Sequence, residues 1–336
     1  MATIYDIAKK CECSTTTVSK VLNNSGKISE SKKKLILETA KNMGYIASQN
    51  ARSLASSNKS SHLIGVMLNV SEDKSITHEM FSSILNSFRI EMEKNGYDIC
   101  FLRTLKDDDY LSYKSLIDSR GIDGLFVLSI DETTPKMKEL FEEDIPYVAF
   151  DMENVVPMIS SNNKEIVAQM VDYLASQGHT RICYICPSSH GVSKYRYRGL
   201  LLGLERNNIT FDERMIVKAP YYSKDSAKIA TDKSLASGID PTVIMYPDDY
   251  TAISAITYLR KLGKKVPNDI SITGFDGIEM GGVISTPLTT VKQDTDEIGY
   301  RAAQILLKRL KRSKNIEDHT VIGARLIIGD TVKNIK

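Results

Sequence analysis

From residue 63 onward, short apolar runs alternate with longer segments in which apolar residues recur every three or four positions. The short runs have the length of buried strands, and the longer segments have the period of amphipathic helices. Strands that alternate with helices form parallel sheets covered by helices on both faces. The pattern therefore predicts an α/β body over residues 61–336.

The body divides into two similar halves. Strands are predicted at residues 64–68, 99–102, 125–129 and 148–150, and again at 182–185, 243–246 and 270–275. Helices are predicted between them, at residues 81–94, 165–177, 195–207, 251–262 and 296–312. Two consecutive sets of strands predict two lobes.

The first 60 residues differ from the body in charge. They contain ten of the 44 Lys and Arg residues but only four of the 42 Asp and Glu residues, a net charge of +6, which leaves −4 for the remainder. A basic segment on an acidic body indicates that the segment meets a polyanion such as nucleic acid. Alternatively, Lys32, Lys33 and Lys34 form only a solvated helix face.

Three short helices are predicted in this basic segment, at residues 4–10, 15–22 and 31–43. Ser14 is a favourable N-cap for the second helix, which follows a tight turn. The apolar positions of that helix face inward and leave Thr15, Thr16 and Lys20 on its outer face. Two helices around a short turn form a helix-turn-helix, whose second helix fits the major groove of DNA. Short hydroxyl side chains and a lysine can reach base edges and phosphates there.

Residues 48–56 have the pattern of two helical turns, and a Ser- and Asn-rich linker follows. A helix this short is marginal by itself in water. We therefore expect a head at residues 1–47, a hinge helix with its linker at 48–60, and the body after them.

Polar residues follow several predicted strands of the body. Asp151, Asp248 and Asp276 each come directly after such a strand. Ligands of open α/β sheets bind beyond the carboxyl ends of the strands, so these carboxylates are candidates to accept hydrogen bonds from ligand hydroxyls, with Arg196 as a donor.

Residues 3–10 (TIYDIAKK), 14–23 (STTTVSKVLN) and 35–51 together resemble the head of the lactose/galactose repressor (LacI/GalR) family, and the resemblance extends along the whole chain. It implies an N-terminal all-α helix-turn-helix head and a two-lobed body like that of periplasmic sugar-binding proteins. The chain would cross between the lobes near Ser160, near Thr289 and after Lys311. The N-terminal lobe would hold about 61–160 and 290–315, and the C-terminal lobe 161–289 and 316–336.

The resemblance also implies a set of DNA contacts. These are Tyr5, Ser14, Thr15, Thr16, Thr17, Lys20, Asn23, Ala51, Leu54 and Ala55. Leu54 matches the family's leucine that wedges into a base step from a paired hinge helix in the minor groove, which kinks the duplex and lets more protein surface touch it. The alternative is that Leu54 packs on the body.

For the ligand, the resemblance matches Arg196, Asp276 and Gln293 to cleft positions of the family and places Phe81 and Tyr222 where relatives have aromatic walls. With Asp151 and Asp248 they form the predicted ligand site. The alternative for each is a capping or turn residue. The chain also departs from the family: Glu12 stands where glycine is usual, and Asn162-Asn163 where Asp-Asn is usual.

Several classes of function are disfavoured. The chain has no phosphate-loop, dinucleotide-binding, zinc-protease or nucleophile-elbow motif, and its five histidines lack metal spacing. Cys183 and Cys186 are spaced as CxxC, but residues three apart on a strand face opposite sides. We therefore expect neither enzyme activity nor a metal or cofactor. No secretory signal or membrane span is visible, which favours the cytoplasm.

The combined prediction is a homodimeric transcription regulator, most simply a repressor, whose affinity for a pseudo-palindromic operator is set by a small effector such as a sugar or a related polar metabolite. Two alternatives stay open. One is a sugar-binding module that does not regulate DNA, and the other is a regulator whose body binds a phosphoprotein corepressor.

Overall fold

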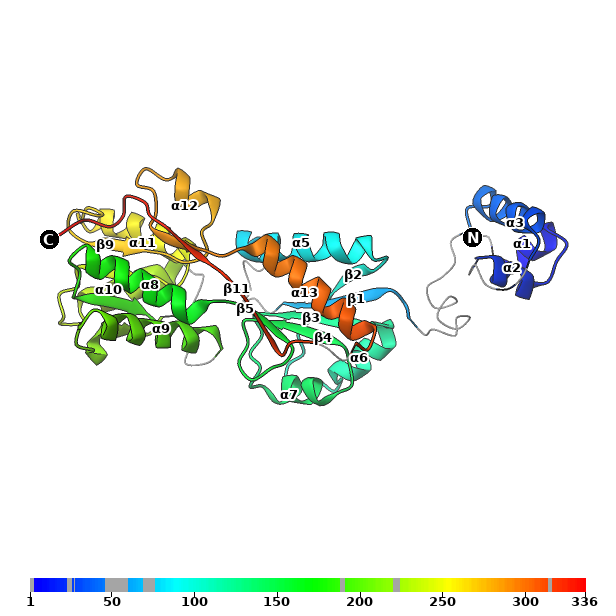
Figure 1. Ribbon diagram of the computed structural model, residues 1–336, viewed down its shortest axis with the longest axis horizontal. Coiled ribbons are helices and arrows are strands. Elements are labelled where there is room, and N and C mark those ends of the chain that lie inside the picture. Colours follow the sequence, from blue (N-terminus) through cyan, green and yellow to red (C-terminus); the bar gives the residue numbers. More distant parts are fainter. Residues whose placement is uncertain are drawn as a thin grey trace.

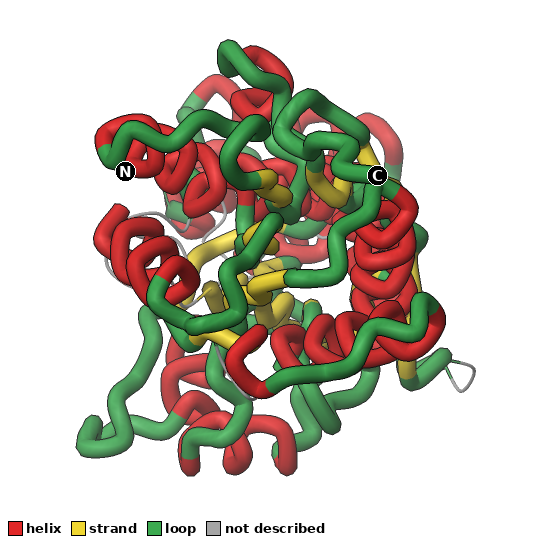
Figure 2. The backbone as a smooth tube through the Cα atoms, turned by 90° about the vertical axis from the view of Figure 1, so that its left-hand side faces the viewer, coloured by secondary structure: helices red, strands yellow, loops and turns green. Residues whose placement is uncertain are grey.

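The computed structural model describes residues 3–22, 26, 28–45, 60–68, 76–187, 191–219, 224–313 and 316–336. A small helical head stands at one end of the molecule, and the body consists of two lobes (Figure 1). In the view along the long axis, strands lie between layers of helices (Figure 2). The predicted fold class is thereby confirmed. No helix within the described ranges is long and apolar enough to cross a membrane.

The described part of the head contains three helices, α1 (Ile4–Lys10), α2 (Thr15–Leu22) and α3 (Glu30–Asn42). Ile7, Val18 and Ile36 form the centre of its core and have no exposed surface. The first two helices have the predicted bounds. Glu12, in the turn between them, has a φ of +47°, a conformation that glycine adopts more readily than other residues. Glu12 therefore adopts, with a side chain, a backbone conformation that glycine would adopt at lower cost.

The N-terminal lobe is built on a six-stranded sheet whose strands are all parallel, in the order β11-β5-β4-β3-β1-β2. Its strands are β1 (Leu63–Leu68), β2 (Asp98–Leu102), β3 (Gly124–Leu128), β4 (Tyr147–Phe150), β5 (Met158–Ser161) and β11 (His319–Ile322). Side chains alternate between the faces of the sheet. Phe126 packs in the core with α5 (Glu79–Lys94) and α13 (Thr295–Leu310). Val127 packs on the other face with α6 (Tyr113–Arg120) and α7 (Pro135–Glu142).

The C-terminal lobe repeats this plan with four parallel strands in the order β7-β6-β8-β9. These are β6 (Ile182–Ile185), β7 (Ile216–Val217), β8 (Val243–Met245) and β9 (Ser271–Thr273). One face is covered by α8 (Asn163–Ser176) and α9 (Val192–Arg206), and the other by α10 (Lys224–Leu235) and α11 (Asp249–Lys261). Short α12 (Glu279–Val283) follows β9. Cys183 of β6 and Cys186, which directly follows β6, belong to the cores on opposite faces, as the strand period predicts.

The chain passes between the lobes in three segments. The first lies between β5 and α8, as expected near Ser160. The second follows β10 (Thr290–Lys292), which bridges to the C-terminal lobe, so the crossing comes slightly later than Thr289. The third leads from β11 into β12 (Arg325–Ile327), which pairs antiparallel with β10.

The prediction that the C-terminal lobe resumes at residue 316 is wrong. β11 pairs in parallel with β5, so the chain stays in the N-terminal lobe as far as Ile322. β11 has no apolar strand pattern because it is an edge strand whose side chains are mostly exposed. Backbone pairing, rather than an apolar pattern, holds it in the sheet.

Candidate functional site

The predicted DNA-reading face lies on and around α2. Thr16 and Lys20 are exposed, and Thr15 is partly exposed. Ser14 accepts a 3.1 Å hydrogen bond from the backbone N–H of Thr17, and the two hydroxyls are 2.9 Å apart. Ser14 therefore caps α2, as predicted, and the start of the helix is fixed from within the head.

Two further head residues, Tyr5 and Lys32, differ in their surroundings. Tyr5 on α1 has 73% of its surface exposed, which leaves its ring available to a partner. Lys32 donates from Nζ to the carbonyl of Cys11 at 2.8 Å. This lysine thus supports the turn between α1 and α2 and is more than part of a solvated face.

Five of the predicted site residues lie outside the described part of the chain. They are Asn23, Ala51, Leu54, Ala55 and Tyr222. Their roles stay predictions.

Arg196 of α9 lies at the boundary between the lobes and is 6% exposed. Its Nε donates to Asn163 Oδ1 at 2.9 Å, and its Nη1 donates to the carbonyl of Pro247 at 3.1 Å. The guanidinium carbon lies 3.5 Å from the centre of the Phe275 ring. Asn163 in turn donates from Nδ2 to Asp151 Oδ1 at 2.9 Å. Arg196 and Asp151 are thus held by one asparagine at the first crossing.

Close helix packing allows Arg196 to reach this position. Gly199, one turn further along α9, faces α8, and a Cβ there would lie only 2.3 Å from the carbonyl oxygen of Lys164. A larger residue would push the two helices apart. Gly199 therefore sets the depth at which Arg196 sits.

Asp276 and Gln293 form a second group of buried polar contacts between the lobes. Gln293 Nε2 donates a hydrogen bond to Asp276 Oδ1 at 2.9 Å, and it also lies 2.9 Å from the sulfur of Met80. Gln293 Oε1 accepts a hydrogen bond from the Ser161 hydroxyl at 2.5 Å. Asp276 Oδ2 is buried without a hydrogen-bond partner among the described residues, and His78 Nε2 lies 3.6 Å away. These contacts join both lobes and two crossing segments.

We call the six polar residues of these contacts the interlobe cluster: Asp151, Ser161, Asn163, Arg196, Asp276 and Gln293. Burial raises the pKa of Asp151 to about 6, although Arg196 and the hydrogen bond from Asn163 oppose the shift. Burial also raises the pKa of Asp276 well above its usual range, and the neighbouring Asp249 and Asp248 add to it. Such carboxyls can accept a ligand hydroxyl when ionised and donate to it when protonated.

Two predicted ligand residues are placed differently. Asp248 is fully buried and caps α11, where its oxygens accept the backbone N–H of Thr251 at 2.8 Å and the Thr251 hydroxyl at 2.7 Å. Phe81 is 3% exposed and belongs to the core of the N-terminal lobe, with its ring centre 5.5 Å from that of His78. Asp248 thus caps a helix, and Phe81 packs in the core of the N-terminal lobe.

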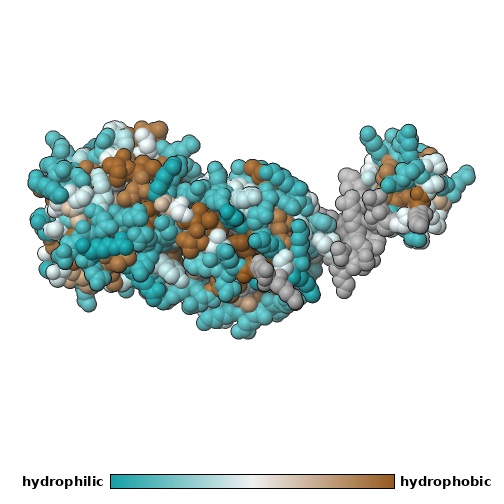
Figure 3. All heavy atoms as spheres, viewed as in Figure 1, coloured by the Kyte–Doolittle hydropathy of each residue, from teal (hydrophilic) through white to brown (hydrophobic). Residues whose placement is uncertain are grey.

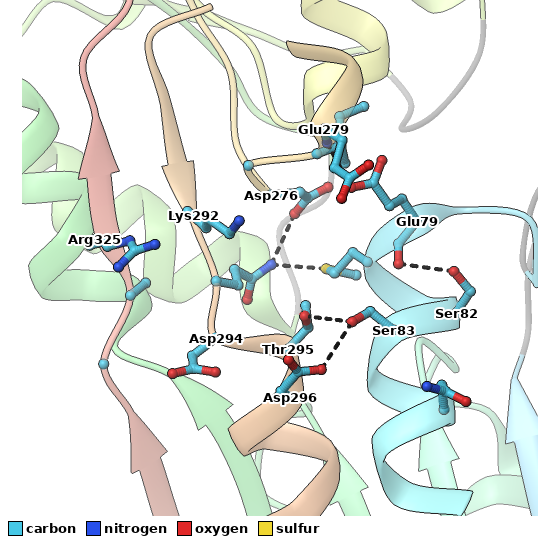
Figure 4. A pocket seen from close by; sticks show the side chains of 17 residues that line it. Glu79, Ser82, Ser83, Asp276, Glu279, Lys292, Asp294, Thr295, Asp296 and Arg325 are labelled. Atoms are coloured by element: carbon cyan, nitrogen blue, oxygen red, sulfur yellow. Dashed lines mark hydrogen bonds between the residues drawn. The ribbon is translucent and has the colours of Figure 1, made fainter. Parts of the chain in front are cut away.

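A pocket of about 1140 Å³ borders the cluster at Asp276 and Gln293. It is lined from the N-terminal lobe by the first half of α5 and the start of α13, where Ser83 bonds to Thr295 at 2.8 Å (Figure 4). From the C-terminal lobe, the backbone N–H of Glu279 donates to Glu79 Oε1 at 2.6 Å. The two lobes therefore touch along the rim of this pocket.

Comparison with known families assigns both parts of the chain. Residues 3–48 match the bacterial regulatory proteins of the lacI family, and residues 171–332 match the periplasmic binding protein-like domain. The HTH-type transcriptional repressor PurR of Aliivibrio salmonicida is 30% identical over 317 residues, which cover 93% of each protein. The chain belongs to the LacI family of bacterial regulatory proteins. It is a DNA-binding transcriptional repressor of the helix-turn-helix type and not an enzyme, as the sequence predicted.

Solved structures share the fold of this LacI-family protein. The lac repressor dimer bound to operator and the anti-inducer ONPF has a TM-score of 0.84 at 22% identity, over 99% of each chain. The complex of the regulator CelR with cellobiose has a TM-score of 0.75 at 20% identity, over 98% of this chain and all of that one. At these identities the likeness concerns the fold.

Sequence reasoning missed four residues that the structure of this LacI-family protein brings to the site: Ser161, Asn163, His78 and Asp249. Asn163 was noted only as a departure from the family, yet it joins Arg196 to Asp151. Ser161 ends a short strand that the apolar pattern did not reveal. His78 and Asp249 stand out only in the structure, where both are buried, and buried ionisable residues are rare unless they have partners.

Proposed function

We propose that the operator affinity of this repressor is controlled by a small polar molecule, a sugar or a related metabolite, which binds between the lobes at the interlobe cluster. The observation that carries the proposal is Asp276 Oδ2, a buried acceptor with no hydrogen-bond partner among the described residues, in the same cluster as the buried Arg196. Buried polar groups in native proteins are almost always hydrogen-bonded, and a ligand hydroxyl would satisfy this one.

The charge of the cluster favours an uncharged ligand. The charge of Arg196 acts on both Asp151 and Asp276, but the pKa of each is raised because burial disfavours its ionised form. An anionic ligand would add negative charge beside these carboxyls. Hydroxyl groups can donate to them and accept from Arg196. The cellobiose of the CelR complex supports this ligand class.

The surface supports a homodimer. Exposed apolar side chains occur on α12, α5 and β2, which lie along one edge of the body (Figure 1). They include Val283, Met280, Ile90 and Phe101, which are 82%, 47%, 40% and 48% exposed. Figure 3 shows hydrophobic residues gathered over α12. Exposed apolar patches of this kind mark protein interfaces, and the lac repressor of similar fold is described as a dimer.

A dimer presents two heads, which suits a pseudo-palindromic operator in double-stranded DNA. We place the head at residues 1–47, the hinge at 48–60 and the two-lobed body after it, and the protein in the cytoplasm. An effector would change the angle between the lobes and so the spacing of the two hinges. It shifts this equilibrium only by its differential affinity for the two states.

The direct test is isothermal titration calorimetry of the wild type and Arg196→Ala with a panel of sugars, polyols and nucleosides. We expect at least one sugar or polyol to bind the wild type, and the variant to bind it at least about tenfold more weakly, because Arg196 is a buried donor. Arg206→Ala is the matched control, since Arg206 pairs with Glu165 and Asp172 on the surface of the same helix pair. If no compound binds the wild type, the proposal is wrong and a protein corepressor becomes the better candidate.

A further inference from the structure

Asp249, the first residue of α11, is fully buried and is not one of the interlobe cluster. Its Oδ2 accepts the backbone N–H of Ile278 at 2.9 Å, and its Oδ1 accepts the hydroxyl of Thr290 at 2.5 Å. Ile278 lies two residues after Asp276, and Thr290 is the first residue of β10. One carboxyl therefore links α11, the loop that carries Asp276 and the strand before the second crossing.

The loop around Asp276 needs such support because its backbone is unusual. Asp276 has a φ of +109° and Gly277 a φ of +68°, and the first value is unfavourable for a residue with a side chain. A Cβ on Gly277 would lie 2.6 Å from Lys292 Cα, and one on Gly274 would lie 2.1 Å from Asp249 Oδ1. The loop therefore packs closely against the Asp249 carboxyl on one side and against β10 on the other.

The same loop is tied to the crossing segment by its own backbone. The N–H of Asp276 donates to the carbonyl of Val291 at 2.8 Å, and Gln293, two residues later, donates to the Asp276 side chain. Asp249 reaches this strand through Thr290. Its contacts therefore determine where the Asp276 carboxyl stands relative to the strand that leads into the other lobe.

We propose that Asp249 is a positioning residue for effector recognition: it holds residues 274–278 so that Asp276 faces the N-terminal lobe, and it fixes that loop to β10. The proposal rests on the proposed function insofar as Asp276 contacts the effector. Among the described residues, the side chain of Asp249 makes its hydrogen bonds to the loop and to β10, so its role can be tested without any ligand.

The protonation of Asp249 gives this role a signature. Burial raises its pKa to about 7, and Asp248 adds to the shift, while the hydrogen bonds from Thr290 and Ile278 oppose it. Tyr250 on its own helix and Asp276 on the loop are the other titratable groups that sense its charge. An unfolded aspartate titrates near 3.9. The ionised carboxyl therefore weakens the native state increasingly as the pH rises from about 4 to about 7, and this effect is absent below the unfolded pKa.

Asparagine offers a conservative replacement. Its amide oxygen can accept the Ile278 N–H, and its amino group can donate to the Thr290 hydroxyl, which then acts as acceptor. Asp249→Asn thus keeps the links and removes the charge, whereas Asp249→Ala removes both. Thr290→Val removes only the link to β10. Thr289→Val is the matched control, because the Thr289 hydroxyl bonds with Gly329 instead.

The first measurement is hydrogen exchange of the effector-free, full-length protein, followed by mass spectrometry over residues 274–283. We expect Asp249→Ala to speed exchange there at least about tenfold, since a bonded buried amide is released. Asp249→Asn should restore most of the protection, Thr290→Val should give an intermediate rate, and Thr289→Val should match the wild type. If Asp249→Ala does not fold, the Asn and Val variants carry the comparison. Two results overturn the proposal. One is an exchange rate in Thr290→Val equal to that of the wild type. The other is an exchange rate of the loop in Asp249→Asn far above that of the wild type.

The second measurement is the melting temperature of wild type and Asp249→Asn from pH 5 to pH 8. We expect the melting temperature of the variant relative to wild type to rise by a few degrees across this range and to level off above about pH 7.5. A difference that stays constant with pH contradicts the placement of a titrating carboxyl against the loop. Neither measurement uses an effector, so failure of the ligand proposal leaves both results unaffected.

Discussion

The side-chain amide of Gln293 donates a 2.9 Å hydrogen bond to Asp276, and this bond joins a crossing segment to a loop of the C-terminal lobe. The same amide also accepts the hydroxyl of Ser161 from the first crossing. Two of the three connections between the lobes therefore meet at one buried side chain. Any change of the lobe angle must rearrange these bonds, which makes Gln293 a sensitive place to perturb the molecule.

Gln293→Glu should destabilise the protein by about 1–3 kcal/mol, because it replaces a donor to Asp276 with a second carboxyl. The loss should be larger at pH 8 than at pH 5, since more of the negative charge is present at the higher pH. Thermal unfolding followed by circular dichroism measures it. Gln304→Glu is the control: Gln304 also donates to a carboxylate, Glu91, but at a partly exposed site where water screens the charge. Equal losses for the two variants would contradict the burial argument.

The contribution of Asp151 to the stability of the wild type should fall as the pH rises from about 4 to about 7. The pKa of Asp151 is about 6 in the native state and near 3.9 in an unfolded chain, so the native state is favoured when this group is protonated. This stabilisation is complete below the unfolded pKa and is lost as the pH passes the native value. Asp151→Asn should remove on the order of 1–3 kcal/mol of this dependence. Identical pH profiles for wild type and variant would show that the pKa of Asp151 is not raised in the native state.

Gly199→Ala should lower the stability by about 1–3 kcal/mol and weaken effector binding as well. The added methyl group would meet the carbonyl of Lys164 and separate α9 from α8, which shifts Arg196. Gly282→Ala in α12 is the control, because a Cβ there meets nothing within 4 Å. Melting temperatures and calorimetry measure both effects. A Gly199→Ala protein as stable as the control would show that the helices can adjust without cost.

Leu54→Ala should weaken specific operator binding at least about tenfold and leave effector binding to the body unchanged. The reason is the predicted wedge, in which an apolar side chain helps to unstack a base step and kink the duplex. A gel-shift titration with a duplex found by footprinting the protein on its own upstream region measures operator affinity. Leu54→Met keeps an apolar side chain of similar volume and should bind nearly as well as the wild type. Equal operator affinity for wild type and Leu54→Ala refutes the wedge.

Much of the fold follows from local patterns along the chain. The helices of the head and most strands of the two sheets were predictable because each has an apolar face with a helical or strand period. The alternation of strands and helices implied parallel sheets, and parallel sheets place Asp151 and Asp276 at the ends of strands, where ligands bind. Arg196 and Gln293 could be proposed from the resemblance of their surroundings to one family.

The tertiary structure alone decided which of these groups meet. Asn163, Ser161 and His78 reach the site because the chain crosses between the lobes, and no local period records such long-range contacts. The same holds for β11, an edge strand held by backbone pairing to a segment 161 positions earlier, as in the pair His319 and Met158. Asp248 and Asp249 are neighbours in sequence, yet one caps a helix and the other supports a loop. The direction of each side chain in the fold, which its residue type does not specify, separates these roles.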